Sequence, residues 1–174
     1  MTAGVTIHKL GDSIDTDVII AGRHLASSDP DYLAKHCLAA IRNDFHTSVA
    51  PGDLMFAGWN FGCGSSRESA PMALKATGLS CIVAKSFSRI YFRNAVNIGL
   101  AALVCPEAVD AVEDGERACV DVATGRIEAA GRSFQATPLP ENLLHIVRAG
   151  GLVALMAQRQ SMVGQPGSTW PGGQ

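Results

Sequence analysis

The sequence predicts a domain of the α/β class, and three observations support this. Short runs of buried-type apolar residues, at 54–57, 81–84 and 100–104, alternate with helical patterns. Alternating apolar residues with turn signals at 118–136 then predict a β meander. The length of 174 residues and the apolar fraction of 47% allow one domain with a substantial core. Together these features indicate a mixed β/α fold.

The N-terminal part predicts one strand and one helix. Residues 5–10 are apolar, and residues 11–17 form a polar turn with three aspartates. The β-branched run Val18-Ile19-Ile20 predicts a short strand. Asp29-Pro30 is typical of an N-cap and a first helical position, so we expect a helix from about Asp31 to Arg42.

Strands and helices alternate in the middle of the chain. Pro51-Gly52-Asp53 is a turn before the strand 54–57, and Ser69 is expected to cap a helix that ends at Gly78. The elements expected next are the strand 81–84, the helix 87–97 and the strand 100–104.

The C-terminal part predicts a helix followed by a tail. The helix opens at residues 140–142, is interrupted by Gly150-Gly151 and resumes to about Gln160. Residues 164–174 are rich in Gly, Pro and Ser, which is typical of a flexible tail. We therefore expect one domain over residues 1–163.

Composition excludes several function classes. The net charge is −2 and no basic run occurs, which argues against nucleic-acid binding. No apolar stretch approaches the roughly 18 residues of a membrane span. The N-terminus lacks a secretory pattern, so a cytoplasmic protein is expected.

The cysteines predict no metal site within this chain. They are odd in number, widely spaced and never in a C-x-x-C pair, which argues against zinc and against a self-contained iron–sulfur site. Cys81 and Cys105 lie in apolar runs and are expected to be buried thiols.

The segment Gly58–Pro71 predicts a binding site for an acidic ligand. Its three glycines permit positive φ and close backbone approach. Ser65 and Ser66 supply hydroxyls, and Arg67 supplies a planar cation that suits a carboxylate. A glycine-rich turn that leads into a helix often holds an anion, because the first helical N–H groups lack internal partners.

This segment resembles the small subunits of isopropylmalate dehydratase and, more broadly, the swivelling C-terminal domain of the aconitase superfamily. Gly11–Ile20 is similar to that family's N-terminal motif, and Ala84–Asn94, continued by Asn97–Leu100, is similar to its second block. The blocks occur in the family's order, and the resemblance covers about residues 5–160.

The resemblance implies a swivelling β/β/α domain and a hydro-lyase that isomerises hydroxy acids by dehydration and rehydration. It also implies a larger partner chain, whose three cysteines hold a [4Fe–4S] cluster. This chain alone would then bind no metal or cofactor, and Cys63 would be a packed or loop thiol, not a cluster ligand.

The resemblance also implies roles for single residues. Ser65, as an alkoxide, would remove the proton next to the substrate carboxylate. Arg67 would bind that carboxylate through two parallel hydrogen bonds, with Ser66 and the backbone at Gly64 contacting the same anion. Loop N–H groups, the following helix N-terminus and Arg67 would stabilise the alkoxide.

Four supporting residues have two interpretations each, and one position departs from the family. Asp15 and Asp17 either orient the serine loop or the subunit interface, or form a turn with their own backbone. Arg89 either holds Glu68 or begins a solvated helix. The family usually has a histidine where this chain has Ser69.

The loop 21–28 bears on substrate choice. Family members that accept a further carboxylate often have an arginine where this chain has Ala26, and a small apolar residue there accepts methyl or isopropyl groups. Arg23 is an alternative cation for that carboxylate. The expected substrate is thus a small branched hydroxy acid, with isopropylmalate in leucine biosynthesis first. The alternatives are a dimethylmalate, homoaconitase-type or methylcitrate-type dehydratase subunit, a non-catalytic acid-binding subunit, or a free-standing phosphate-binding module.

Overall fold

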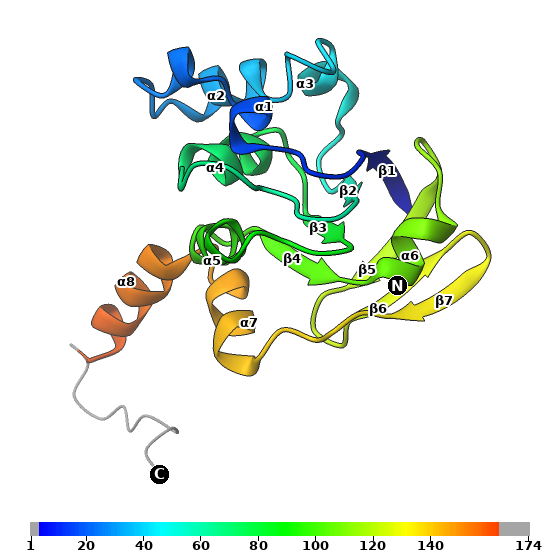
Figure 1. Cartoon of the computed structure of the whole chain (residues 1–174). Coiled ribbons are helices and arrows are strands. Elements are labelled where there is room, and N and C mark those ends of the chain that lie inside the picture. Colours follow the sequence, from blue (N-terminus) through cyan, green and yellow to red (C-terminus); the bar gives the residue numbers. More distant parts are fainter. Residues whose placement is uncertain (1–3, 164–174) are drawn as a thin grey trace.

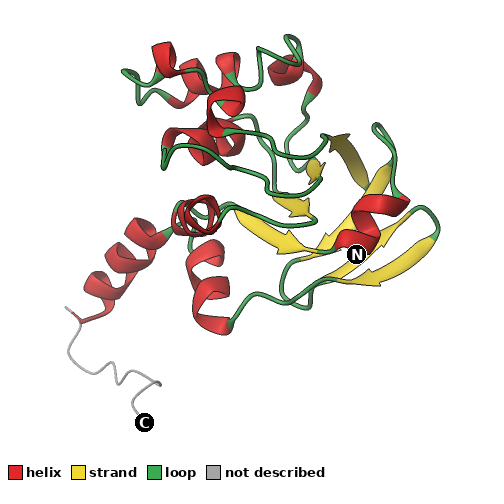
Figure 2. Ribbon diagram, viewed as in Figure 1, coloured by secondary structure: helices red, strands yellow, loops and turns green. Residues whose placement is uncertain are grey.

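The computed structural model describes residues 4–163, which form a curled sheet with helices on both faces (Figures 1 and 2). The strands are β1 (Val5–Lys9), β2 (Leu54–Ala57), β3 (Cys81–Ala84), β4 (Ala101–Val104), β5 (Arg117–Asp121), β6 (Arg126–Ala129) and β7 (Arg132–Gln135). The helices are α1 (Thr16–Ile19), the 3-10 turn η1 (Gly22–His24), α2 (Pro30–His36), α3 (Phe45–Ser48), α4 (Ser69–Ala76), α5 (Arg89–Asn97), α6 (Pro106–Ala111), α7 (Glu141–Arg148) and α8 (Leu152–Val163).

The seven strands form one sheet in the order β4-β3-β2-β1-β5-β6-β7. Strands β1 to β4 pair in parallel, whereas β5 pairs antiparallel with β1, and β5, β6 and β7 pair antiparallel in turn. A bridge between Val104 and Thr137 joins the segment after β7 back to β4, so the sheet curls toward closure. The predicted α/β class and the β meander are confirmed.

Both faces of the parallel strands are buried, which explains their unbroken apolar runs. Leu54 and Phe56 of β2 face a core shared with β5, β6, α6 and α7. Met55 and Ala57 face the opposite core, which α1, α2, α3 and α4 cover. The loops that follow the parallel strands therefore begin at strands that are packed on both faces.

The prediction of a strand at Val18-Ile19-Ile20 is wrong, because this run belongs largely to helix α1. The Asp15 carboxylate accepts a hydrogen bond from the Asp17 N–H, at 2.7 Å, and so caps the helix. Ile19 and Ile20 are fully buried. Capping and burial outweigh the modest β preference of these branched side chains.

The predicted N-cap of α2 is confirmed, but the helix is shorter than expected. Asp29 accepts from the Asp31 N–H at 3.2 Å, and Pro30 occupies the first turn. Cys37 is extended, and Leu38 has a φ of 56° and donates its N–H to the carbonyl of Ile19 at 2.8 Å. The chain therefore leaves the helix to pack against α1.

Helix α4 begins one residue earlier than predicted. Glu68 is already αR and occupies the N-cap position, so Ser69 is the first helical residue and does not cap it. No side chain caps this helix, and its first N–H groups remain available for other partners. The sequence did not predict η1, α3 or α6, which are all shorter than two helical turns.

The end of the chain follows the prediction, with α7 and α8 separated by Gly150-Gly151. None of the described helices is long and apolar enough to cross a membrane. The predicted tail, residues 164–174, lies outside the described residues.

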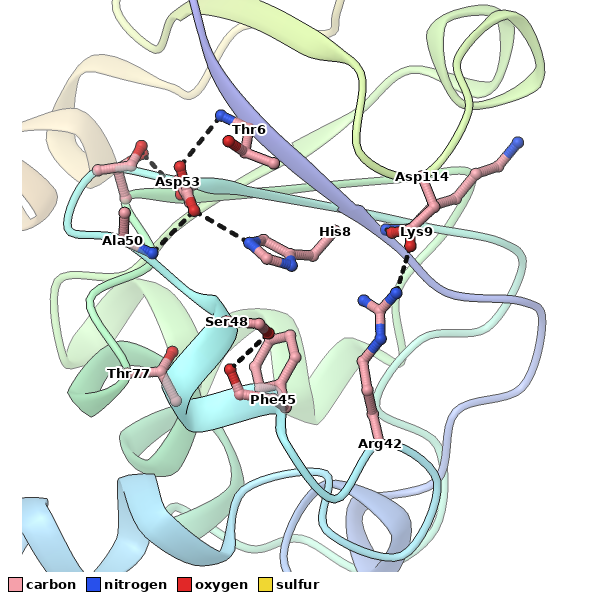
Figure 3. Close-up of polar contacts among 12 residues, drawn as sticks. Thr6, His8, Lys9, Arg42, Phe45, Ser48, Ala50, Asp53, Thr77 and Asp114 are labelled. Atoms are coloured by element: carbon pink, nitrogen blue, oxygen red, sulfur yellow. Dashed lines mark hydrogen bonds and ion pairs between the residues drawn. The ribbon is translucent and has the colours of Figure 1, made fainter.

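A buried polar cluster ties β1 to the turn before β2 (Figure 3). Asp53 accepts hydrogen bonds from His8 Nε2 at 3.0 Å, the Thr6 N–H at 3.0 Å and the Ala50 N–H at 2.9 Å. The ring of His8 meets Phe45 edge to face. Burial alone would raise the pKa of Asp53, but the hydrogen bonds from His8, Ala50 and Thr6 together hold it below its ordinary value. This cluster holds β1, from which the first polar loop continues, against the turn before β2.

Candidate active site

Two loops, 10–16 and 58–63, run side by side at the end of the parallel strands. Backbone hydrogen bonds join Gly58 N–H to Gly11 C=O at 3.0 Å, Ser13 N–H to Trp59 C=O at 2.7 Å and Gly62 N–H to Ile14 C=O at 2.8 Å. Two motifs that lie far apart in the sequence therefore form one continuous structure. Carboxyl ends of parallel strands commonly carry ligand sites, so a site is expected at this end of the strands.

Close backbone approach requires all three loop glycines, since a Cβ on Gly58 would lie 1.8 Å from Asp12 Oδ1. A Cβ on Gly62 would lie 2.1 Å from Tyr91 Cγ, and one on Gly64 would lie 2.3 Å from Asp15 Oδ2. Both residues also have positive φ, of 75° and 91°. The backbone at Gly64, just before the serine pair, therefore lies against the carboxylate that caps α1.

Both serine side chains face outward from this scaffold. Ser65 and Ser66 are exposed. The backbone of Ser65 is nevertheless held, because the buried Thr16 hydroxyl donates to its carbonyl at 3.1 Å. Within residues 4–163, neither serine hydroxyl has a hydrogen-bond partner. A fixed backbone with free hydroxyls is the arrangement that a reacting or binding serine needs.

Arg67 extends from the serine loop to the other elements of the site. Its guanidinium forms an ion pair with the Asp17 carboxylate, and its side chain is only 24% exposed. Its Nη1 lies 3.7 Å from the position of a Cβ on Gly22. The structure therefore brings together Asp15, Asp17, Gly64 and Arg67, all predicted site residues. The ion pair uses one end of the fork, and guanidinium N–H donors remain for a substrate carboxylate.

The loop 21–28 lies next to Arg67 through η1. Arg23 and Ala26 are both exposed. Arg23 Nε donates to His24 Nε2 at 3.2 Å. Arg23, predicted as an alternative cation for a carboxylate, thus lies on η1, and Gly22, the first residue of η1, approaches Arg67.

The expected pairing of Glu68 with Arg89 is not present in the part of the chain that the structure describes. Both residues are exposed, at the starts of α4 and α5. Ser69 is half-buried at the first position of α4. Lys85, another basic residue of the second block, instead pairs with Asp110 and lies over the Trp59 ring.

Three residues that support the loop were not predicted to do so. Thr16 holds the Ser65 carbonyl, Ser86 Oγ accepts the Asn60 N–H at 2.7 Å, and Tyr91 packs against Gly62. Ser86 and Tyr91 belong to the second block of the family pattern, so the co-occurrence of the blocks was the available signal. Nothing in the sequence marked Thr16 beyond its place between two aspartates.

The described residues hold no candidate metal centre. No group of three or more His, Cys, Asp or Glu side chains within residues 4–163 could bind a metal ion. Cys81 and Cys105 are buried as predicted, and burial raises the pKa of the Cys81 thiol to about 12. Cys63 is partly buried, and its carbonyl accepts the Thr16 N–H at 2.9 Å. The cysteines of this chain therefore do not fit an iron–sulfur cluster.

Comparison with known proteins agrees with this fold. Residues 16–108 match the model of the aconitase C-terminal domain family. The 3-isopropylmalate dehydratase small subunit of Caldicellulosiruptor bescii is 53% identical over 148 residues, which cover 84% of this chain and 89% of that protein. The 2,3-dimethylmalate dehydratase small subunit of Eubacterium barkeri is 50% identical over 155 residues, covering 88% and 95%. The crystal structure of 3-isopropylmalate dehydratase from Methanocaldococcus jannaschii has a TM-score of 0.86 and 38% identity, covering 91% of this chain and 95% of that one.

The curled mixed sheet and the matched region define an aconitase-type C-terminal domain. The chain belongs to this family and, within it, to the small subunits of the 3-isopropylmalate dehydratase type. The predicted family, fold class and enzyme class are confirmed.

Proposed function

We propose that this chain is the small subunit of a two-chain hydro-lyase that interconverts 2-isopropylmalate and 3-isopropylmalate through a dehydrated intermediate, in leucine biosynthesis. The observation that carries the proposal is the pair of free serine hydroxyls beside Arg67, on a loop held by the Asp15–Asp17 segment. The Caldicellulosiruptor bescii relative, 53% identical, is the small subunit of a 3-isopropylmalate dehydratase. A small subunit implies a large partner chain, and we propose a cytoplasmic location for the pair.

In this proposal Ser65 is the base. Its oxyanion takes the proton from the carbon next to the substrate carboxylate, and the electron pair left behind forms the double bond as hydroxide leaves the adjacent carbon. Rehydration at the other carbon gives the isomer. A serine is a weak base unless its anion is stabilised. We propose the uncapped N–H groups of α4 and the Arg67 guanidinium, which follow Ser65 closely in the chain, as the donors that do this.

Arg67 binds the substrate carboxylate in this scheme, and Asp17 fixes the guanidinium from the opposite side. Ser66 and the backbone at Gly64 complete the contact with the same anion. Ala26 admits the alkyl group, because its methyl side chain offers no charge to a further carboxylate.

The [4Fe–4S] cluster is proposed for the partner chain, because the described cysteines do not gather into a ligand set. When bound there, the cluster supplies Lewis-acid chemistry at the substrate hydroxyl. The residues of this chain bind the carboxylates and move the proton.

A second candidate substrate follows from the 50% identity to a dimethylmalate dehydratase small subunit. The test is to reconstitute the chain with its large subunit and measure turnover of isopropylmalate, dimethylmalate and homocitrate-type acids. We expect isopropylmalate to give the highest kcat/KM, since Ala26 leaves room for its alkyl group. Turnover of dimethylmalate alone would move the assignment to the second candidate. Absence of turnover with every acid would leave an acid-binding subunit.

A further inference from the structure

Three aromatic side chains form a cluster beside the loop 21–28. The rings of His24 and His36 stack, with centroids 4.0 Å apart and planes within 10°. Tyr32 lies against both rings and its hydroxyl is 2.9 Å from His24 Nδ1. Tyr32 and His36 belong to α2, so the cluster connects this helix to η1. No role in the proposed reaction has been assigned to it so far.

The hydrogen bonds of His24 define its protonation. Arg23 Nε, which can only donate, is 3.2 Å from His24 Nε2. Nε2 must therefore accept, and Nδ1 carries the proton and donates it to the Tyr32 hydroxyl. Burial, His36 and Arg23 together lower the pKa of His24, which favours this neutral form.

The same bond fixes Arg23. Its guanidinium makes no ion pair within residues 4–163, so His24 is the side chain that orients it. The preceding residue, Gly22, approaches Arg67 Nη1. The two arginines thus belong to adjoining parts of one site. A malate-type substrate carries two carboxylates, so Arg23, which the sequence offered only for a further carboxylate, is here assigned to the second of these two, with Arg67 for the first.

We propose that His24, held by Tyr32 and His36, is a positioning residue that orients Arg23 toward the second carboxylate of the substrate. This inference rests on the proposed function. It gives α2 an indirect part in substrate recognition, through Tyr32 and His36.

The first test uses steady-state kinetics of the reconstituted enzyme with isopropylmalate. Arg23→Ala is expected to raise KM about tenfold or more, because a charge-assisted contact is lost. His24→Phe keeps a ring but removes the acceptor, and is expected to raise KM about fivefold with kcat within about twofold. His24→Gln can still accept from Arg23 Nε and is expected to restore KM to within about twofold. The control His145→Gln alters an exposed residue of α7 and should change neither constant.

A double-mutant cycle separates positioning from general loosening. In an Arg23→Ala background, His24→Phe is expected to have no further effect on KM, since its partner is already gone. An equal rise of KM in both backgrounds would overturn the proposal. An unchanged KM in Arg23→Ala or in His24→Phe would also overturn it. In either case, turnover of isopropylmalate by the parent enzyme would still support the proposed function.

A second measurement does not depend on activity. Nitrogen NMR of the isolated chain is expected to show His24 in the Nδ1–H tautomer, and to show loss of this preference in Arg23→Ala. A His24 tautomer that is unaffected by Arg23→Ala would contradict the proposed bond, whatever the enzyme turns over.

Discussion

At the scale of single residues, the candidate site depends on contacts that each hold one group. Thr16 fixes the carbonyl of Ser65, Asp17 pairs with Arg67, and Gly64 leaves room for the Asp15 carboxylate. Ser65, the side chain proposed to react, is exposed, whereas Thr16, which holds the backbone of Ser65, is buried. Binding and support are therefore divided between different residues.

Asp53 ties β1 to the turn before β2, and its removal should lower stability in a pH-dependent way. Asp53→Asn leaves a buried N–H group without its charged acceptor, so we expect a loss of about 1–3 kcal/mol at neutral pH. Because the folded-state pKa of Asp53 is lowered, its contribution is complete above the unfolded pKa of about 3.9 and is lost as the pH falls below it.

Chemical denaturation at neutral pH and below about pH 4 measures this difference. The difference in the free energy of unfolding between the parent chain and Asp53→Asn should be smaller in acid than at neutral pH. Asp44→Asn, a change at an exposed position, is the matched control. Its free energy of unfolding should be close to that of the parent chain at both pH values. If Asp53→Asn lowers the free energy of unfolding equally at both pH values, ionisation of Asp53 does not stabilise the fold.

At the scale of elements, helix α1 links the fold to the site. Its cap, Asp15, also lies against Gly64, and its Asp17 pairs with Arg67. Asp15→Ala should cost about 1 kcal/mol of stability through the lost cap. It should also lower kcat/KM of the reconstituted enzyme about tenfold or more, because Arg67 loses its alignment.

Asp121→Ala provides the control for this prediction. Asp121 likewise accepts backbone N–H groups, in the turn between β5 and β6, far from the serine loop in sequence. It should lower stability without lowering kcat/KM. If Asp15→Ala and Asp121→Ala affect kcat/KM equally, α1 has no special connection to the site.

The sequence predicted elements well where one local rule acts alone. The buried runs 54–57 and 81–84 became strands as expected, because both faces of each are covered. The prediction failed at 18–20, where a cap and tertiary burial compete with β propensity. It also overextended the helix at 31–42, because the contact from Leu38 to Ile19 is visible only in three dimensions.

The site was predicted in part for a similar reason. The segment Gly58–Pro71 predicted Ser65 and Arg67 as residues of one site, whereas Asp17 had two interpretations, and the family resemblance assigned roles that remain proposals. The sequence could not show that Asp17 pairs with Arg67, or that Glu68 and Arg89 stand apart. It also gave His36 no role, since stacking on His24 requires α2 and η1 to meet.

At the scale of the whole molecule, the proposed function makes the exposed serine loop one part of a site that the large subunit completes. In the proposed function this chain binds a carboxylate and accepts a proton, and no group of three or more His, Cys, Asp or Glu side chains among residues 4–163 could hold a metal ion. We therefore expect the isolated chain to be colourless, to contain no stoichiometric iron and to lack hydro-lyase activity. Absorption spectra, iron analysis and turnover assays before and after addition of the large subunit check this. A brown and active single chain would contradict the two-chain account.

The most direct measurement of the central claim is turnover by the reconstituted enzyme carrying Ser65→Ala, with Ser66→Ala as its neighbour control. The account predicts that Ser65→Ala lowers kcat by at least about 1,000-fold with KM within a few-fold, because the proton acceptor is lost while Arg67 still binds the carboxylate. Ser66→Ala should have the smaller effect. A Ser65→Ala enzyme whose kcat stays within about tenfold of the parent value would show that Ser65 is not the base.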